Sequence, residues 1–279
     1  MQRTRNSMLC PNCRRLISRD EAVCPYCQTG RPGSWWKGGL LGASFGWGRS
    51  VEYIIYANVA MYLLALLISP RQVGLTSSPF DLLAPGISAL QRLGATGTVA
   101  ILRQHHWWTL LAANYLHGSL LHILFNMLAL RQLGPLVVRE YGASRMVVIY
   151  TLAGVLGFVV SVLAGVRFTI GASAAVCGLM GAILYYGKSR GGAYGQAIYS
   201  QVGAWAVGIL VFGFMFPGIN NWGHGGGMAA GVVLGYLLGY QERYREGLGH
   251  RGLAFACAVI TVLVLAWATL NGLFFVLVR

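Results

Sequence analysis

The sequence predicts an all-α polytopic membrane protein with seven transmembrane helices, preceded by a small zinc ribbon. Of the 279 residues, 56% are hydrophobic and only 10% are charged, and the mean hydropathy is +0.59. Such a composition is typical of multi-pass membrane proteins. Seven apolar stretches are long enough, or nearly so, to cross about 30 Å of hydrocarbon as helices. Two Cys-x-x-Cys pairs precede all of these stretches.

The N-terminal segment, residues 1–34, predicts a metal-stapled cytoplasmic module. Cys10 and Cys13 form one pair, Cys24 and Cys27 form the other, and ten residues separate the pairs. This spacing allows four thiolates to bind one tetrahedral zinc ion. About thirty residues bury too little surface to fold unaided, so the metal would supply the folding energy. An iron centre and a redox thiol pair are the alternatives, and the module can be a plain cap as well as a sensor.

Residues 35–50 predict an interfacial linker, because tryptophan and lysine beside a first span suit the headgroup region. The first thirty residues are polar and basic, so no cleavable signal peptide is expected and the first helix acts as the targeting signal. The absence of a transit-like sequence favours a bacterial plasma membrane over an organelle. The predicted spans are approximately 52–69, 113–131, 146–164, 171–187, 198–216, 224–240 and 252–277.

The placement of lysine and arginine predicts the orientation in the membrane. These residues are frequent before the first span and after spans two, four and six, and sparser in the other loops. By the positive-inside rule the N-terminus is cytoplasmic, and with seven spans the C-terminus is outside. The same rule accounts for most of the net charge of +14, for which anionic lipid headgroups are a sufficient partner. Nucleic-acid binding is not expected.

Polar side chains inside three of the apolar stretches point to chemistry. Ser173 opens one stretch and His224 opens another, and both are predicted near the outer surface. Gly227, Gly231 and Gly235 follow His224 on one helical face, where small residues let two helix backbones approach closely. The approach would bring the serine hydroxyl within hydrogen-bonding reach of the imidazole. Because polar groups are costly in hydrocarbon, an intramembrane active site is the favoured interpretation.

A third stretch carries His117, His122 and Asn126. His122 and Asn126 are four residues apart and share a helical face, an arrangement of donors suited to stabilising negative charge on a tetrahedral intermediate. The alternative is that these side chains only satisfy one another across helix interfaces, as polar groups in membrane bundles often do.

Three motifs together resemble the rhomboid family of intramembrane serine proteases over residues 52–240. His117-Gly-Ser-Leu-Leu-His122-Ile-Leu-Phe-Asn126 is similar to the H-x-x-x-x-H-x-x-x-N motif of the family's second helix. Gly171-Ala172-Ser173 is similar to the G-x-S motif of the fourth helix, and His224-Gly-Gly-Gly227 to the H-x-x-G motif of the sixth.

The resemblance implies a fold, a chemistry and a substrate class. The fold is a rhomboid-like core of six helices, to which the seventh helix is appended. Ser173 would be the nucleophile and His224 the general base, with no cofactor for catalysis. His122, Asn126 and the backbone N–H of Ser173 would form the oxyanion hole, and His117 would hydrogen-bond within the loop before the second helix. The substrates would be transmembrane segments of other proteins, cut near the outer face. The domain boundaries that follow are 1–34 for the module, 35–50 for the linker, 51–245 for the core and 246–279 for the extra helix.

Four positions depart from the family pattern. Ala174 replaces a glycine, Cys177 replaces an aromatic residue that packs on the catalytic histidine, Trp107-Trp108 replaces a Trp-Arg pair, and Gly223 replaces an alanine. None of these changes removes a reacting group, so activity is still expected. The loop at about 70–112 resembles the family's membrane-embedded lateral loop.

Other protease classes are excluded by the residue inventory. An aspartyl intramembrane protease needs two aspartates in the membrane, but Asp20 and Asp81 lie outside the predicted spans. A metalloprotease needs the motif H-E-x-x-H, which is absent. A Ser–Lys pair would have to use Lys188, which is fifteen positions from Ser173 on one helix. That separation is about 22 Å at 1.5 Å per residue, too far for a Ser–Lys pair. A catalytically weak or inactive protein that binds transmembrane clients remains the main alternative, followed by a channel or transporter.

Overall fold

The computed structural model describes residues 7–10, 15–18, 20–26, 49–69, 82–216 and 218–277, with the side chains of 275–277 left out. The chain divides into two compact units, Met1–Arg49 and Ser50–Arg279. Every long helix of the described residues therefore belongs to the second unit, and this includes the C-terminal helix at Leu248–Leu277.

The first unit contains a two-stranded antiparallel sheet, β1 (Ser7–Leu9) and β2 (Leu16–Ser18). The backbone N–H of Cys10 donates to the carbonyl of Arg15 at 2.9 Å, which extends the pairing by one residue beyond the strands. Cys10, Ile17 and Cys24 form one buried cluster. Cys13 and Cys27 lie outside the described residues, and within those residues no group of three or more potential ligands gathers. The zinc ribbon therefore stays a prediction.

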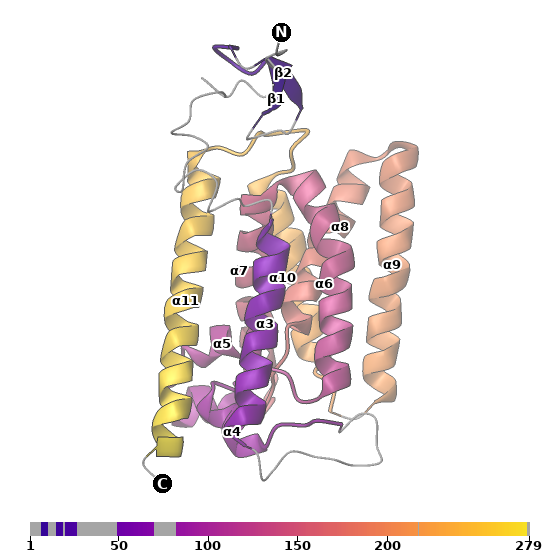
Figure 1. Ribbon diagram of the computed structural model, residues 1–279. Coiled ribbons are helices and arrows are strands. Elements are labelled where there is room, and N and C mark those ends of the chain that lie inside the picture. The colour runs from indigo at the N-terminus through magenta and orange to yellow at the C-terminus, as the bar shows by residue number, and fades with distance from the viewer. Residues whose placement is uncertain are drawn as a thin grey trace. The chain divides into compact units, whose positions relative to one another are not determined.

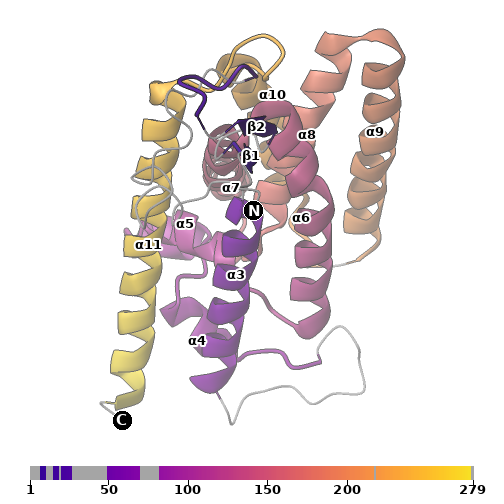
Figure 2. The same ribbon diagram turned by 45° about the horizontal axis from the view of Figure 1, so that its top comes forward.

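The second unit is a bundle of long helices joined mostly by short connections. Within 49–69, 82–216 and 218–277 these helices are α3 (Ser50–Leu67), α6 (Leu120–Tyr141), α7 (Ala143–Leu163), α8 (Ser173–Arg190), α9 (Gly192–Met215), α10 (Asn221–Leu238) and α11 (Leu248–Leu277). In Figure 1 and Figure 2, α11 and α9 stand at opposite edges of the bundle, with the other long helices between them. α8 packs against α7, α9 and α10.

Five helices of the described chain, α3, α6, α7, α9 and α11, are long and apolar enough to cross a membrane. α8 and α10 fall short of that criterion. α8 ends in Tyr185, Tyr186, Lys188 and Arg190, and α10 begins with Asn221 and His224. Most residues of α8 are nevertheless buried against other helices, so the helix does not need an apolar surface facing lipid. The protein is a multi-pass integral membrane protein, and the seven-span arrangement remains a prediction.

The second predicted span differs from the structure at both ends. α6 begins at Leu120 and ends at Tyr141, instead of covering 113–131. The hydroxyl of Ser119 accepts from the backbone N–H of His122 at 3.3 Å and so caps the first turn. His117 consequently lies in the loop before the helix, while His122 lies on its first turn. The helix also contains Pro135 and continues past it.

The described part of the first long loop carries short helical pieces. These are α4 (Ile87–Arg92), the π-helical turn η4 (Val99–Arg103), α5 (Thr109–Ala112) and the 3-10 turn η5 (Ala113–Tyr115). The backbones of Thr96 and Thr169 pair in an isolated antiparallel bridge, which joins this loop to the connection between α7 and α8. We call the end of the bundle at which α8 begins the serine end. α4 and the last turn of α11 lie at this end too (Figure 1).

Candidate active site

Ser173 and His224 meet at the serine end of the bundle. Ser173 is the first residue of α8, and His224 lies in the first turn of α10. The Nε2 atom of His224 is 2.9 Å from the Oγ atom of Ser173, a hydrogen-bonding distance. His224 is 7% exposed, and Ser173 is partly exposed. A partly exposed serine therefore contacts a largely buried imidazole.

The two helices approach closely because both present small residues along the contact. A Cβ atom added to Gly227 would run into the carbonyl oxygen of Ala174, and one added to Gly231 would run into that of Gly178. Gly231 follows Gly227 by four residues on α10, and Gly178 follows Ala174 by four residues on α8, so the second contact lies about one helical turn after the first. The backbones of α8 and α10 therefore touch directly, and this contact fixes the depth at which Ser173 faces His224.

A glycine of α7 completes this contact from a third helix. A Cβ on Gly157 would lie 2.7 Å from the carbonyl oxygen of Gly223 and 3.0 Å from the Cβ of Ala174. Distances below 3.0 Å are essentially never seen for real Cβ atoms, so this position has no room for a side chain. Ala174, which departs from the family pattern, therefore fits against a glycine. The sequence reasoning did not single out Gly157, because nothing local shows what packs on it.

Asn220 holds the start of α10 in place. Its Oδ1 accepts from the backbone N–H of Gly223 at 2.9 Å and caps the helix. Its Nδ2 donates to the Oγ of Ser161 at 2.7 Å and to the Oγ1 of Thr169 at 2.9 Å. The cap thereby links the turn of His224 to α7 and to the loop before α8. Asn220 was not among the predicted site residues, although an asparagine just before a glycine-rich helix is a recognisable N-cap signal.

His122 faces the space beside Ser173. Its Nδ1 accepts from the backbone N–H of Gly118 at 3.3 Å, so in the neutral ring the proton is on Nε2. A Cβ on Gly171 would lie 2.7 Å from this Nε2 atom and 3.7 Å from the Oγ of Ser173. Gly171 has a φ of +122°, a conformation that side-chain-bearing residues rarely adopt. The glycine thus leaves open the space bordered by the imidazole N–H and the serine hydroxyl.

Asn126 lies one turn after His122 on α6 and is 7% exposed. Its Nδ2 donates to the backbone carbonyl of His122 at 2.9 Å. A primary amide carries two hydrogens, so one donor remains beyond this contact. The structure therefore places Asn126 next to His122 on the same helix.

His117 is fully buried, but not in the way expected. Among the residues described, neither of its ring nitrogens has a hydrogen-bond partner, whereas hydrogen bonds within the loop were predicted. Its ring instead packs edge-on against His122, with 5.0 Å between centroids. The side chain supports the His122 ring by packing.

The His224 Nδ1 atom is buried and also lacks a hydrogen-bond partner among the described residues. Glu140 pairs with Arg139, Glu242 pairs with Arg190, and Glu246 hydrogen-bonds the first turn of α7. These acidic side chains all belong to the end of the bundle opposite Ser173. In the part of the chain that the structure describes, a serine and a histidine therefore meet without a third, carboxylate partner.

Residues 104–241 match the family model of the Rhomboid domain. The chain is 36% identical to Rhomboid protease GluP of Bacillus subtilis (strain 168) over 129 residues, which cover 46% of this chain and 25% of that protein. It is 29% identical to RHOMBOID-like protein 4 of Arabidopsis thaliana over 195 residues, 64% of this chain and 50% of the relative. It is also 30% identical to Inactive RHOMBOID-like protein 8 of Arabidopsis thaliana over 153 residues, 52% of this chain and 42% of the relative. The chain thus spans a quarter to a half of the length of these relatives.

Proposed function

Because residues 104–241 match the Rhomboid domain family, we propose that this chain is an intramembrane serine endopeptidase of that family. The single observation that carries this proposal is the distance of 2.9 Å between Ser173 Oγ and His224 Nε2. The similarity to a named protease, Rhomboid protease GluP, supports it. A serine hydroxyl within hydrogen-bonding distance of a histidine nitrogen is the arrangement on which acyl-transfer chemistry depends.

In the proposed reaction, Ser173 attacks a peptide carbonyl while His224 takes the hydroxyl proton on Nε2. The imidazolium then donates this proton to the leaving amine, and water hydrolyses the acyl-enzyme by the same route in reverse. For Nε2 to accept the proton, the neutral ring must carry its own proton on Nδ1. No metal or organic cofactor enters these steps.

The oxyanion of the tetrahedral intermediate would be bound by three donors. They are the Nε2–H of His122, the remaining amide hydrogen of Asn126 and the backbone N–H of Ser173. The last group lies in the first turn of α8, where backbone N–H groups have no partner within the helix and carry a partial positive charge. Donors of this kind, held in a site shielded from water, are worth several kcal/mol to such a reaction, about 3–4 kcal/mol for a single donor.

The substrates would be transmembrane segments of membrane proteins, cut near the face at which the serine end lies. The charge distribution supports an outer position for this end. Among the described residues, Arg145, Lys188, Arg190, Arg243, Arg245 and Arg251 all lie near the opposite end of the bundle. The positive-inside rule assigns that end to the cytoplasm, and with it the N-terminus. A substrate helix would have to unwind locally, because a helix hides its carbonyl groups from attack.

The test is cleavage of a single-pass transmembrane reporter in proteoliposomes. Wild-type protein is expected to cut the reporter, while Ser173→Ala and His224→Ala fall to background. Ser189→Ala, at the far end of the same helix, and His250→Ala, on α11, are the matched controls and should retain activity. Equal cleavage by Ser173→Ala and wild type would disprove the dyad.

A client-binding protein without turnover is the second candidate, and the similarity to Inactive RHOMBOID-like protein 8 is the observation in its favour. The same variants separate the two functions. A binder would hold the reporter in a pull-down and leave it uncut, with no difference between wild type and Ser173→Ala.

For the N-terminal unit we propose a zinc ion bound by Cys10, Cys13, Cys24 and Cys27. The burial of Cys10 and Cys24 in one small cluster supports this assignment. Elemental analysis of the full chain should give one zinc per protein, and the variant Cys24→Ser should lose it. Iron in place of zinc, or no metal, would refute the assignment.

A further inference from the structure

Thr169 contacts the residue that begins the helix of His224. The Nδ2 atom of Asn220 donates to the Oγ1 of Thr169 at 2.9 Å and to the Oγ of Ser161 at 2.7 Å. Both hydrogens of this amide therefore have a partner, and its carbonyl oxygen caps α10 at Gly223. Thr169 is 5% exposed, so little water can reach its hydroxyl and replace it as the acceptor. The orientation of the Asn220 amide is thus fixed by partners on both of its sides.

The backbone of Thr169 is held by a different part of the chain. Thr96 and Thr169 exchange two backbone hydrogen bonds, one of 3.1 Å from the N–H of Thr96 and one of 2.8 Å from that of Thr169. The two segments lie so close together that a Cβ added to Gly97 would run into the carbonyl oxygen of Arg167. Thr169 therefore joins residues 95–109, which we call the threonine loop, to the cap of α10.

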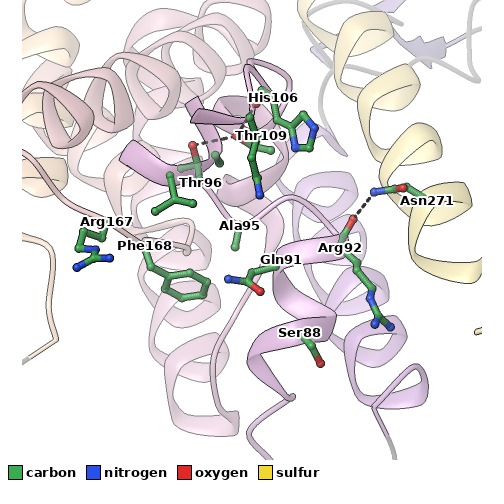
Figure 3. Close-up of a pocket in the computed structure, with 13 residues that line it drawn as sticks. Ser88, Gln91, Arg92, Ala95, Thr96, His106, Thr109, Arg167, Phe168 and Asn271 are labelled. Atoms are coloured by element: carbon green, nitrogen blue, oxygen red, sulfur yellow. Dashed lines mark hydrogen bonds between the residues drawn. The ribbon is translucent and has the colours of Figure 1, made fainter. Parts of the chain in front are cut away.

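Two buried hydroxyls hold the threonine loop together. Those of Thr96 and Thr109 hydrogen-bond to each other at 3.0 Å, and each residue is 1% exposed. Thr109 also donates to the carbonyl of His106 at 2.7 Å. Figure 3 shows these three residues in the wall of a polar pocket of 420 Å³, which opens between α4, the threonine loop and α11. Elsewhere the loop exposes Leu102 and Trp107, side chains that suit the membrane interface. The loop therefore connects this interface with Thr169.

We propose that Thr169 is a positioning residue for His224, and that through it the threonine loop sets the alignment of the Ser173–His224 pair. The backbone of Thr169 follows the loop, whereas its hydroxyl holds the Asn220 amide. The backbone carbonyl of Asn220 in turn accepts from the N–H of His224 at 3.1 Å. A shift of the loop therefore moves the first turn of α10. The inference rests on the proposed protease function for its effect on turnover, while the position of the His224 ring can be measured without turnover.

The experiment compares Thr169→Val with Thr169→Ser in the full chain. Valine has nearly the shape of threonine without the hydroxyl, and serine keeps the hydroxyl without the methyl group. We expect Thr169→Val to lower kcat for the reporter about tenfold and to leave KM within about twofold of wild type, because one hydrogen bond is worth about tenfold. Labelling of Ser173 by a fluorophosphonate needs the aligned pair but no transmembrane substrate, and it should slow by the same factor. Thr169→Ser should restore both rates.

A second readout follows the histidine itself. In protein labelled at histidine with the heavy nitrogen isotope, the ring nitrogen NMR signals of His224 report its hydrogen bond to Ser173, and His224→Ala assigns them. Thr169→Val should shift these signals, and Thr169→Ser should return them to their wild-type positions. If wild type neither cuts the reporter nor reacts with the fluorophosphonate, the proposed function fails, and the NMR signals still decide the role of Thr169.

Matched controls separate this role from general effects on the loop. Thr98→Val removes a hydroxyl of the threonine loop that lies outside this set of hydrogen bonds, and it should behave as wild type. Gly97→Ala drives a Cβ into the carbonyl of Arg167 and should separate the loop from Thr169, so that kcat and labelling fall. Gly165→Ala is its control, because it also places a side chain at a positive φ, +82°, but meets nothing within 4 Å.

The losses at Thr169 and Asn220 should not add. Asn220→Asp has already lost the donor to Thr169, so the further change Thr169→Val should lower kcat by less than about twofold. Fully additive losses overturn the proposal, and so do wild-type turnover and unshifted His224 signals in Thr169→Val. Failure of Thr169→Ser to restore the rates would assign the effect to packing and also overturns it. Equal losses in Gly97→Ala and Gly165→Ala overturn the part assigned to the loop.

Discussion

The carboxylate of Glu246 caps the first turn of α7, where its Oε1 atom accepts from the backbone N–H of Ser144 at 2.8 Å. The same atom accepts from the N–H of Arg145 at 3.1 Å. Glu246 and Ser144 are 102 positions apart, so one side chain joins the segment before α11 to the first turn of α7. An anionic group at this position also complements the partial positive charge of the helix N-terminus.

Replacing this carboxylate should loosen α11 from the core. We expect Glu246→Gln to lower the free energy of unfolding by about 1–2 kcal/mol, because a charged cap loses both its charge and part of its hydrogen bonding. Glu242→Gln, which breaks a solvent-exposed pair with Arg190, is the matched control and should change stability by less than about 1 kcal/mol. Thermal unfolding in detergent measures both. Equal losses in the two variants would show that the cap has no special role.

A methyl group between α8 and α10 should separate Ser173 from His224. In Gly231→Ala the added Cβ meets the carbonyl oxygen of Gly178, and the helices have to move apart. We expect a stability loss of about 1–3 kcal/mol, typical of overpacking, together with a strong fall in kcat. Gly225→Ala is the control on the same helix, since its Cβ would meet nothing within 4 Å. If both variants cut the reporter equally, the backbone contact does not set the site.

Asn220 should act on turnover through the position of His224. Asn220→Ala removes the cap of α10 and both links from Nδ2, with an expected stability cost of about 1–2 kcal/mol. We expect kcat to fall and KM to change little, because the hydrogen bonds of Asn220 go to Ser161, Thr169 and Gly223 and so position the helix that carries His224. Asn220→Asp keeps an acceptor for the cap and loses the donors to Ser161 and Thr169. Activity in the aspartate variant that equals wild type would mean that only the cap matters.

The thiol of Cys177 should take no part in catalysis. The side chain is 1% exposed and lies one turn after Ser173 on α8. We expect Cys177→Ala to cut the reporter at a rate within about threefold of wild type, since a buried cysteine behaves as a small apolar residue. Thiol-blocking reagents should likewise leave the activity of the wild-type protein unchanged in the reporter assay. Loss of activity in the alanine variant would assign the thiol a role.

Much of the helical order could be predicted from the sequence, because apolar length and motif order are local properties of the chain. Ser173, His224 and the glycines after His224 stood out because polar and small residues are conspicuous in apolar stretches. The start of α6 was predicted too early, since hydropathy does not register the cap that Ser119 provides. The hydropathy pattern similarly gave no sign that residues 99–103 form a π-helical turn.

Other parts of the site depend on contacts between distant segments. Gly157 looks like any glycine of an apolar helix until Gly223 and Ala174 are placed against it. Asn220 becomes informative only when Ser161 and Thr169 lie within reach of its amide. The pocket between α4 and α11 has the same origin, since 179 residues separate Asn271 from the carbonyl that it binds.

The direct contact between the backbones of α8 and α10 also determines when the serine and histidine become aligned. No side chain stands between the helices at Gly227 and Gly231, so there is no rotamer whose change could open or close the gap. The pair is therefore aligned when the protein folds, and in the proposed protease little reorganisation would remain for the chemical step. Movements that admit a proposed substrate would then occur in elements other than these two helices.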